Sequence, residues 1–78
     1  MRNDEFAALM PFISADLAAM IAQRQRITDK EAIKKLYASK LYETLEDEQT
    51  KLWHYSTSML FSLFEQEERT GTIAYPDV

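Results

Sequence analysis

The sequence contains no cysteine, and among its 78 residues only one is glycine and two are proline. Without thiols the chain cannot form disulfides, thiolate zinc sites or a cysteine nucleophile, and it fits a reducing compartment such as the cytoplasm. So little glycine and proline disfavours a turn-rich sandwich or barrel, and one glycine cannot build a glycine-rich phosphate loop. We therefore expect an all-α protein.

Long apolar runs are scarce as well. A membrane-spanning helix needs roughly 18–20 predominantly apolar residues, and no stretch is expected to reach this length. The N-terminal segment is similar to a secretion signal, but Asp4 and Glu5 stand where the basic region belongs, and Asp16 interrupts the apolar run. The sequence therefore predicts a cytoplasmic protein with no membrane contact.

The charges are unevenly distributed along the chain. Residues 1–40 contain seven Lys or Arg and five Asp or Glu, a balance of +2, whereas residues 41–78 contain two and eight, a balance of −6. These halves sum to the net charge of −4. An acidic C-terminal half repels nucleic acid and anionic membranes, and it suits a protein partner with a basic surface.

Apolar residues in the first segment recur at steps of three and four, the pattern of an amphipathic helix. They are Phe6, Leu9, Met10, Ile13, Leu17, Met20 and Ile21. We predict a helix from Phe12 to about Arg24, with Phe12 in the core. Because Pro11 removes a backbone donor, the residues before it either continue the helix through a kink or form a separate short piece.

A second helix is predicted to begin after Thr28. Thr28 followed by Glu31 fits a capping box, and Ile33, Leu36 and Tyr37 are expected to face the core.

Two readings are open for the residues that follow. One long helix would align Ile33, Tyr37, Leu41 and Leu45, whereas Ser39 could cap a new helix over residues 40–48. The break at Ser39 is the reading adopted.

The chain after this helix is predicted to be extended over residues 50–55, with Trp53 and Tyr55 on one side and Leu52 and His54 on the other. A last helix begins at Ser56 or Ser58 and ends at Gly71, and the acids at 65–68 are interpreted as its solvated face. Its inward residues are Leu60, Phe61, Leu63 and Phe64. The tail 72–78 is expected to be extended, and residues 51–55 and 72–75 could pair as a minimal two-stranded ribbon.

Catalytic and metal-binding patterns are weak. His54 is the only histidine, and the acids lie in consecutive runs that splay around a helix instead of facing each other across a cleft. Zinc prefers nitrogen or sulfur ligands, of which only one is present. We expect neither an enzyme nor a bound metal or other cofactor.

The stretch at 45–56, LEDEQTKLWHYS, is the best candidate for an interaction surface. Aromatic residues beside acids can anchor a basic partner, because tryptophan and tyrosine are enriched in interface hot spots. The candidate surface comprises Glu46, Asp47, Glu48, Trp53, His54 and Tyr55. In so small a core, however, Trp53 is favoured as a volume-filling residue.

A DNA-binding function is the alternative. Residues 27–48 are similar to a helix-turn-helix, in which Lys30, Lys34 and Lys35 could contact phosphates. The second helix of that motif would carry the acids at 43 and 46–48, which oppose the phosphate backbone. Nucleic acid is therefore the less favoured partner.

The central segment resembles a group of short uncharacterised bacterial proteins from gut anaerobes. The likeness lies in Leu-Glu-Asp-Glu at 45–48, Thr-Lys-Leu-Trp at 50–53 and the tail Gly-Thr-Ile-Ala-Tyr-Pro at 71–76. It covers residues 30–76 and implies a defined small fold, with no activity or catalytic residue to transfer. Small families of this kind often accompany toxin-like or accessory genes, which implies a protein partner.

Together these observations predict one domain over residues 1–78, a bundle of three to four short helices. The function favoured is a non-enzymatic protein-interaction module or a small accessory, antitoxin-like regulator. A second copy could complete its small core and make a homodimer.

Overall fold

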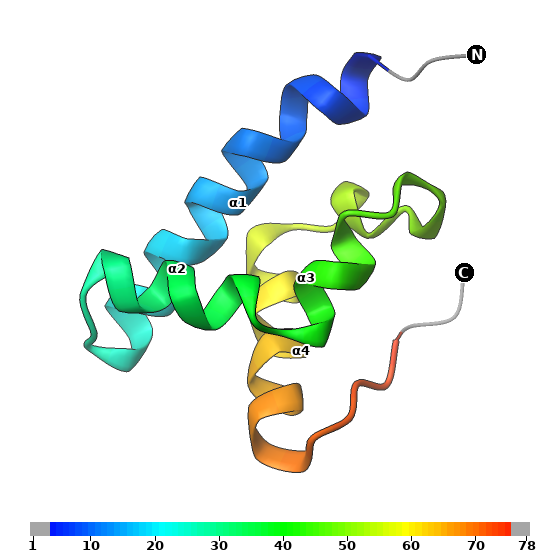
Figure 1. Ribbon diagram of the computed structural model, residues 1–78. Helices are drawn as coiled ribbons and strands as arrows, with labels where there is room; N and C mark the ends of the chain where they lie inside the picture. The colour runs from blue at the N-terminus through cyan, green and yellow to red at the C-terminus, as the bar shows by residue number, and fades with distance from the viewer. Residues whose placement is uncertain (1–3, 76–78) are drawn as a thin grey trace.

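The computed structural model describes residues 4–75, within which the chain forms four α-helices connected by short turns (Figure 1). The elements are α1 (Asp4–Gln25), α2 (Asp29–Tyr37), α3 (Lys40–Leu45), the 3-10 turns η1 (Glu48–Thr50) and η2 (Leu52–His54), and α4 (Thr57–Thr70). The all-α bundle is confirmed. No strand forms in residues 4–75, so the prediction of a ribbon between 51–55 and 72–75 is wrong. Residues 76–78 of the expected tail lie outside the described residues.

The first helix runs unbroken through Pro11, so it begins well before Phe12 and its first turns are not a separate piece. Ala7 and Pro11 are both exposed, so the carbonyl that loses its partner at this proline is open to water. The helix ends at Gln25, and the next residue, Arg26, adopts a left-handed φ of 58°. The Ile27 amide then donates to the Ala22 carbonyl at 3.0 Å, the bond that closes a Schellman turn.

Both predicted caps between the next helices are confirmed. At the start of α2 the Glu31 amide donates to the Thr28 hydroxyl at 3.1 Å, and the Thr28 amide donates to the Glu31 carboxylate at 3.0 Å. Ser39 breaks the chain as expected, and its hydroxyl accepts from the Tyr42 amide at 3.1 Å. The new helix α3 ends at Leu45, three residues short of the prediction.

The last helix also begins and ends as predicted. The Ser56 hydroxyl accepts from the Met59 amide at 3.1 Å, so Ser56 is the cap and Ser58 is not. Gly71 ends the helix with a left-handed φ of 79°, where a side chain would be strained.

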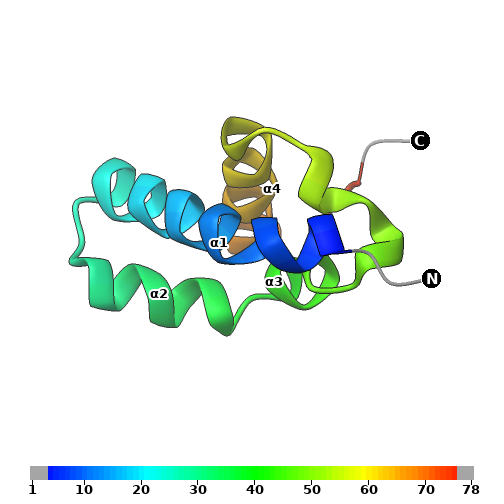
Figure 2. The same cartoon turned by 90° about the horizontal axis from the view of Figure 1, so that it is seen from above.

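The core lies where α1 packs on α2 and α4, with α3 and η2 closing its end (Figure 2). Its fully buried side chains are Leu17, Ile21, Ala32, Leu36, Leu41 and Leu45, with Leu60 and Phe64 nearly so. The prediction of a core position is wrong for three residues, because Phe12 is 69% exposed, Tyr37 57% and Ile33 41%. In α2 the buried pair is Ala32 and Leu36, one turn apart, which rotates Ile33 and Tyr37 to the edge.

One expectation about the first helix needs correction. The segment Glu5–Gln25 is long and apolar enough, by length and composition alone, to cross a membrane. Within the bundle, 28% of its most apolar window is buried. Core helices of soluble proteins and signal sequences meet the same criterion. In this structure Leu17 and Ile21 of that helix are fully buried in the bundle core.

Candidate protein-interaction surface

At the polar end of the bundle, two glutamates of α4 make internal bonds to residues of other elements. The Glu67 carboxylate accepts the amides of Lys40 at 2.8 Å and of Leu41 at 3.0 Å, the first two donors of α3. A carboxylate placed there also meets the positive end of the helix dipole. Glu67 therefore caps α3 from another helix, and the interpretation of 65–68 as a merely solvated face is wrong.

A second cluster joins the ends of α1 and α2 to α4. The Lys35 ammonium lies 2.8 Å from the Glu68 carboxylate and donates to the Gln25 amide oxygen at 2.7 Å. The Gln25 amide nitrogen donates in turn to Glu68 at 2.6 Å. The three lysines proposed for a phosphate contact are all exposed, and of these Lys35 forms an ion pair with Glu68.

Trp53 is a core residue and not an exposed anchor. Its side chain is 5% exposed, its ring meets Phe6 edge-on at 5.3 Å, and its indole N–H donates to the Glu48 carbonyl at 3.0 Å. The proposed surface therefore loses Trp53, while Glu46, Asp47 and His54 are exposed, and Glu48 and Tyr55 are half-buried. The stretch is a connection held by a buried tryptophan.

The extended conformation predicted for 50–55 is wrong because local side chains hold a turn. The Asp47 carboxylate accepts from the Gln49 amide at 3.0 Å, and the Thr50 hydroxyl bonds to the Thr44 and Asp47 carbonyls. Lys51 then adopts a left-handed φ of 62° between η1 and η2. With that reversal Leu52 and Trp53 both face the core, instead of alternating.

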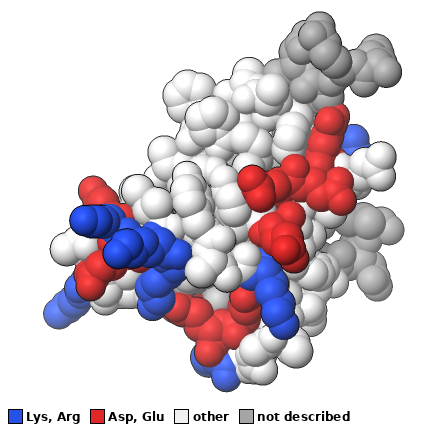
Figure 3. Space-filling view, viewed as in Figure 1, with Lys and Arg blue, Asp and Glu red and all other residues white. Residues whose placement is uncertain are grey.

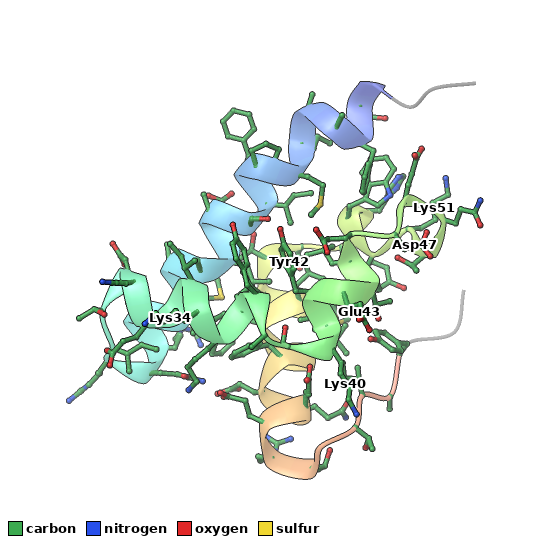
Figure 4. The ribbon with its side chains drawn as sticks, in the orientation of Figure 1. Lys34, Lys40, Tyr42, Glu43, Asp47 and Lys51 are labelled. Atoms are coloured by element: carbon green, nitrogen blue, oxygen red, sulfur yellow. The ribbon has the colours of Figure 1, made fainter. Side chains whose placement is uncertain are left out.

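Exposed acids gather beside this connection, and Glu43, Glu46 and Asp47 are named here the acidic border. Figure 3 shows them as one red group, and Figure 4 places Glu43 and Asp47 along α3 and the turn that follows. In the described part of the chain, no three His, Cys, Asp or Glu residues are placed to hold a metal ion. The acids line a surface and do not converge on a point.

A groove of about 660 Å³ lies between α1 and α2 and reaches α3. Most of its floor is small or apolar, contributed by one face of α1, and Asp29, Ile33 and Tyr37 of α2 form the opposite wall. The α1 side consists of Ala7, Met10, Pro11, Ser14, Ala15, Ala18 and Ala19. Pockets of this volume and lining are typical of binding sites in proteins.

Tyr42 stands at the α3 end of the groove, close to Tyr37 at a ring distance of 4.6 Å. Burial raises the pKa of its phenol above the ordinary 10.0, and Tyr37 and Glu46 raise it further, whereas a hydrogen bond with Ser14 lowers it. Tyr42 is therefore neutral at physiological pH and links the apolar floor to the acidic border.

Two exposed lysines of α2, Lys30 and Lys34, follow the wall residues Asp29 and Ile33 in the sequence and are named here the basic border. Figure 4 places Lys34 on α2 and Glu43 on α3 with Tyr42 between them, and Figure 3 shows an uncharged surface between a mainly blue group, which has red among it, and a red group. The face thus has an apolar centre with opposite charges at its two sides.

The apolar stripe of the first helix does not by itself indicate this groove. The signal was present: Ala7, Ala15 and Ala19 give the rest of that helix a small, uncharged surface. A helix that is apolar on several faces has more than one contact to make.

Comparisons of the chain with protein-family models, with curated proteins and with solved structures give no match in any of the three.

Proposed function

We propose that the protein is a non-enzymatic interaction module of the cytoplasm, a small accessory or antitoxin-like regulator that binds another protein without a cofactor. The observation that carries the proposal is the apolar groove between α1 and α2, left uncovered beside two charged borders. Exposed apolar surface with a polar rim is typical of protein-interaction sites.

The groove and the acidic border together define the chemistry of the partner. An amphipathic helix could lay its apolar side on the alanine-rich floor, since small side chains permit close approach. Basic residues at the partner's edge would meet Glu43, Glu46 and Asp47, with His54 as a further exposed contact. Polar groups at the opposite end of the bundle are already paired internally and have little to offer a partner.

A pull-down from native cytosol at low salt, with the full chain as bait, tests the proposal. Ala15→Glu places a charge on the groove floor, and Gln23→Glu adds the same charge at an exposed position of α1 outside the groove. We expect the wild type and Gln23→Glu to retain one stoichiometric protein that Ala15→Glu loses. Equal capture by all three proteins, or none above background, would contradict the groove as the binding surface.

DNA binding is the second candidate, favoured only by the exposure of Lys30 and Lys34. Two observations oppose it. The acidic border lies on α3, the helix that would contact the DNA bases, and Lys35 is already in an ion pair. A mobility shift on arbitrary duplex at low salt distinguishes the two functions. We expect no shift, and a salt-sensitive shift lost in Lys30→Glu, Lys34→Glu would favour DNA.

A further inference from the structure

We infer that the partner covering this face is a second copy of the chain, related by a two-fold axis that lies in the plane of the contact. The inference rests on the proposed function, because it names the occupant of the same surface. Three observations carry it: the opposite charges of the two borders, the apolar residues at the rim, and the area that a stable dimer requires.

The charges on the two sides differ in sign. Around the basic border Arg26, Lys30 and Lys34 outnumber Asp29 and Glu31 by three to two, and Asp29 lines the groove itself. On the other side the acids at 43 and 46–48 outnumber Lys40 and Lys51. The balance is therefore positive on the α2 side and negative on the α3 side.

A two-fold axis that lies in the plane of the contact, perpendicular to the line joining the two borders, would bring these unlike borders together. In an isologous contact with the axis in this direction, the basic border of each copy faces the acidic border of the other, twice per dimer. A partner that is basic throughout would match Glu43, Glu46 and Asp47 but would repel Lys30 and Lys34. A second copy satisfies both sides of the groove.

The rim also supplies side chains that can enter the partner's groove. Phe12 lies in α1 three residues before Ala15 and four after Ala8, on a strip of exposed residues next to the floor. With 69% of its surface exposed, it is the least buried large apolar residue of the described chain. Each copy thus offers a concave floor of alanines and a projecting aromatic ring.

A standard interface covers about 800 Å² per partner, which is about one seventh of the 5375 Å² surface of the chain. Phe12, Ile33 and Tyr37 are among the large exposed apolar residues of α1 and α2 available for such a contact.

Charge reversal in sedimentation velocity tests the inference on the purified full chain, up to millimolar concentration. One variant carries Lys30→Glu and Lys34→Glu, the other Glu43→Lys and Glu46→Lys; all four positions are exposed, so both should fold. We expect the wild type to dimerise and each variant to weaken self-association by about tenfold or more, because like charges would meet. Mixing the two variants should restore a dimer, since every border then faces the opposite charge.

The outcomes separate this inference from the proposed function. A wild type that stays monomeric at every concentration, or a mixture that fails to restore association, would overturn the second copy as occupant. If the wild type is monomeric and Ala15→Glu still loses a different protein from cytosol, the proposed function stands and only the dimer is wrong. If that pull-down also shows no dependence on Ala15, both are wrong.

Discussion

The two ends of this small bundle use their side chains in opposite ways. At the junction of α2, α3 and α4, carboxylates from α4 reach across the chain, and Glu67 satisfies amides 26 and 27 residues away. On the face of α1 and α2, large apolar residues such as Phe12 and Tyr37 stay in solvent and contribute little to the core. Folding is therefore secured at one end, while the other keeps a surface available for binding.

The same comparison explains why α1 is long. Its inner face supplies Leu17 and Ile21 to the core, and these residues hold α2 and α4 together. Its outer face lines the groove with small side chains. One helix thus serves both regions, and substitutions on its two faces should have separable effects.

The largest effect is expected for Phe64→Ala in the core. Phe64 is 1% exposed, and removing a buried phenylalanine typically costs about 3–5 kcal/mol. A domain of this size has a free energy of unfolding of about 4–12 kcal/mol, so much of its stability would be lost. Urea unfolding followed by circular dichroism measures the change.

Phe12→Ala is the matched control, because it deletes the same atoms from an exposed site. At a protein concentration where the chain is monomeric, we expect its free energy of unfolding to lie within about 0.5 kcal/mol of the wild type. A loss comparable to that of Phe64→Ala would show that the α1 face is part of the monomer core, and it would remove the contrast between the two regions.

An intermediate effect is expected for Glu67→Gln at the polar junction. The amide keeps one acceptor oxygen but replaces the other with a donor, so one of the two bonds to α3 is lost together with the charge. Charge-assisted hydrogen bonds contribute about 1.5–3 kcal/mol, and we expect a loss near the lower value. Glu43→Gln on exposed α3 serves as the control in the same urea titration, where a larger loss than for Glu67→Gln would contradict the assigned cap.

A smaller effect is expected for the cap of α2. Thr28→Ala removes the acceptor of the Glu31 amide, and losing such a cap costs about 1 kcal/mol. Ser58→Ala, two residues after the cap of α4, should change little. Equal thermal midpoints for Thr28→Ala and Ser58→Ala would show that the box contributes nothing.

The same box predicts a pH dependence. The Thr28 amide, and then its hydroxyl, lower the pKa of Glu31 below the ordinary 4.5. Because the folded pKa is the lower one, the stabilisation is complete above about pH 4.5 and is lost as the pH falls through the folded value. Glu31→Gln removes the titrating group, so the free energy of unfolding should vary less with pH in this range. An unchanged pH dependence in this variant would contradict the role of Glu31.

Much of the helical pattern could be predicted from local sequence. Ser39 begins α3 and Gly71 ends α4 through hydrogen bonds to residues three and four positions away. A short stretch of sequence is therefore enough to predict both roles. The helix faces were harder to predict. Periodicity placed Ile33, Leu36 and Tyr37 inside, but of these only Leu36 is buried, together with Ala32 one turn earlier.

Long-range features could not be predicted in the same way. Nothing near Glu67 in the sequence indicates that it caps a helix beginning at Lys40, because the bond depends on how α4 crosses α3. The groove likewise needs α1 and α2 to be placed side by side before the alanines become its floor. In the candidate surface Glu46 and Asp47 are exposed as expected and Glu48 is half-buried, whereas Trp53 is a core residue, the reading that the sequence favoured.

The buried position of Trp53 gives the molecule a built-in optical reporter. It is the chain's single indole, and its ring meets Phe6 near the start of α1 while its N–H is bonded to the Glu48 carbonyl. Its emission therefore depends on whether the first turns of α1 are docked against η2. Opening of that helix end can be followed by fluorescence, without a label and separately from events at the opposite end of α1.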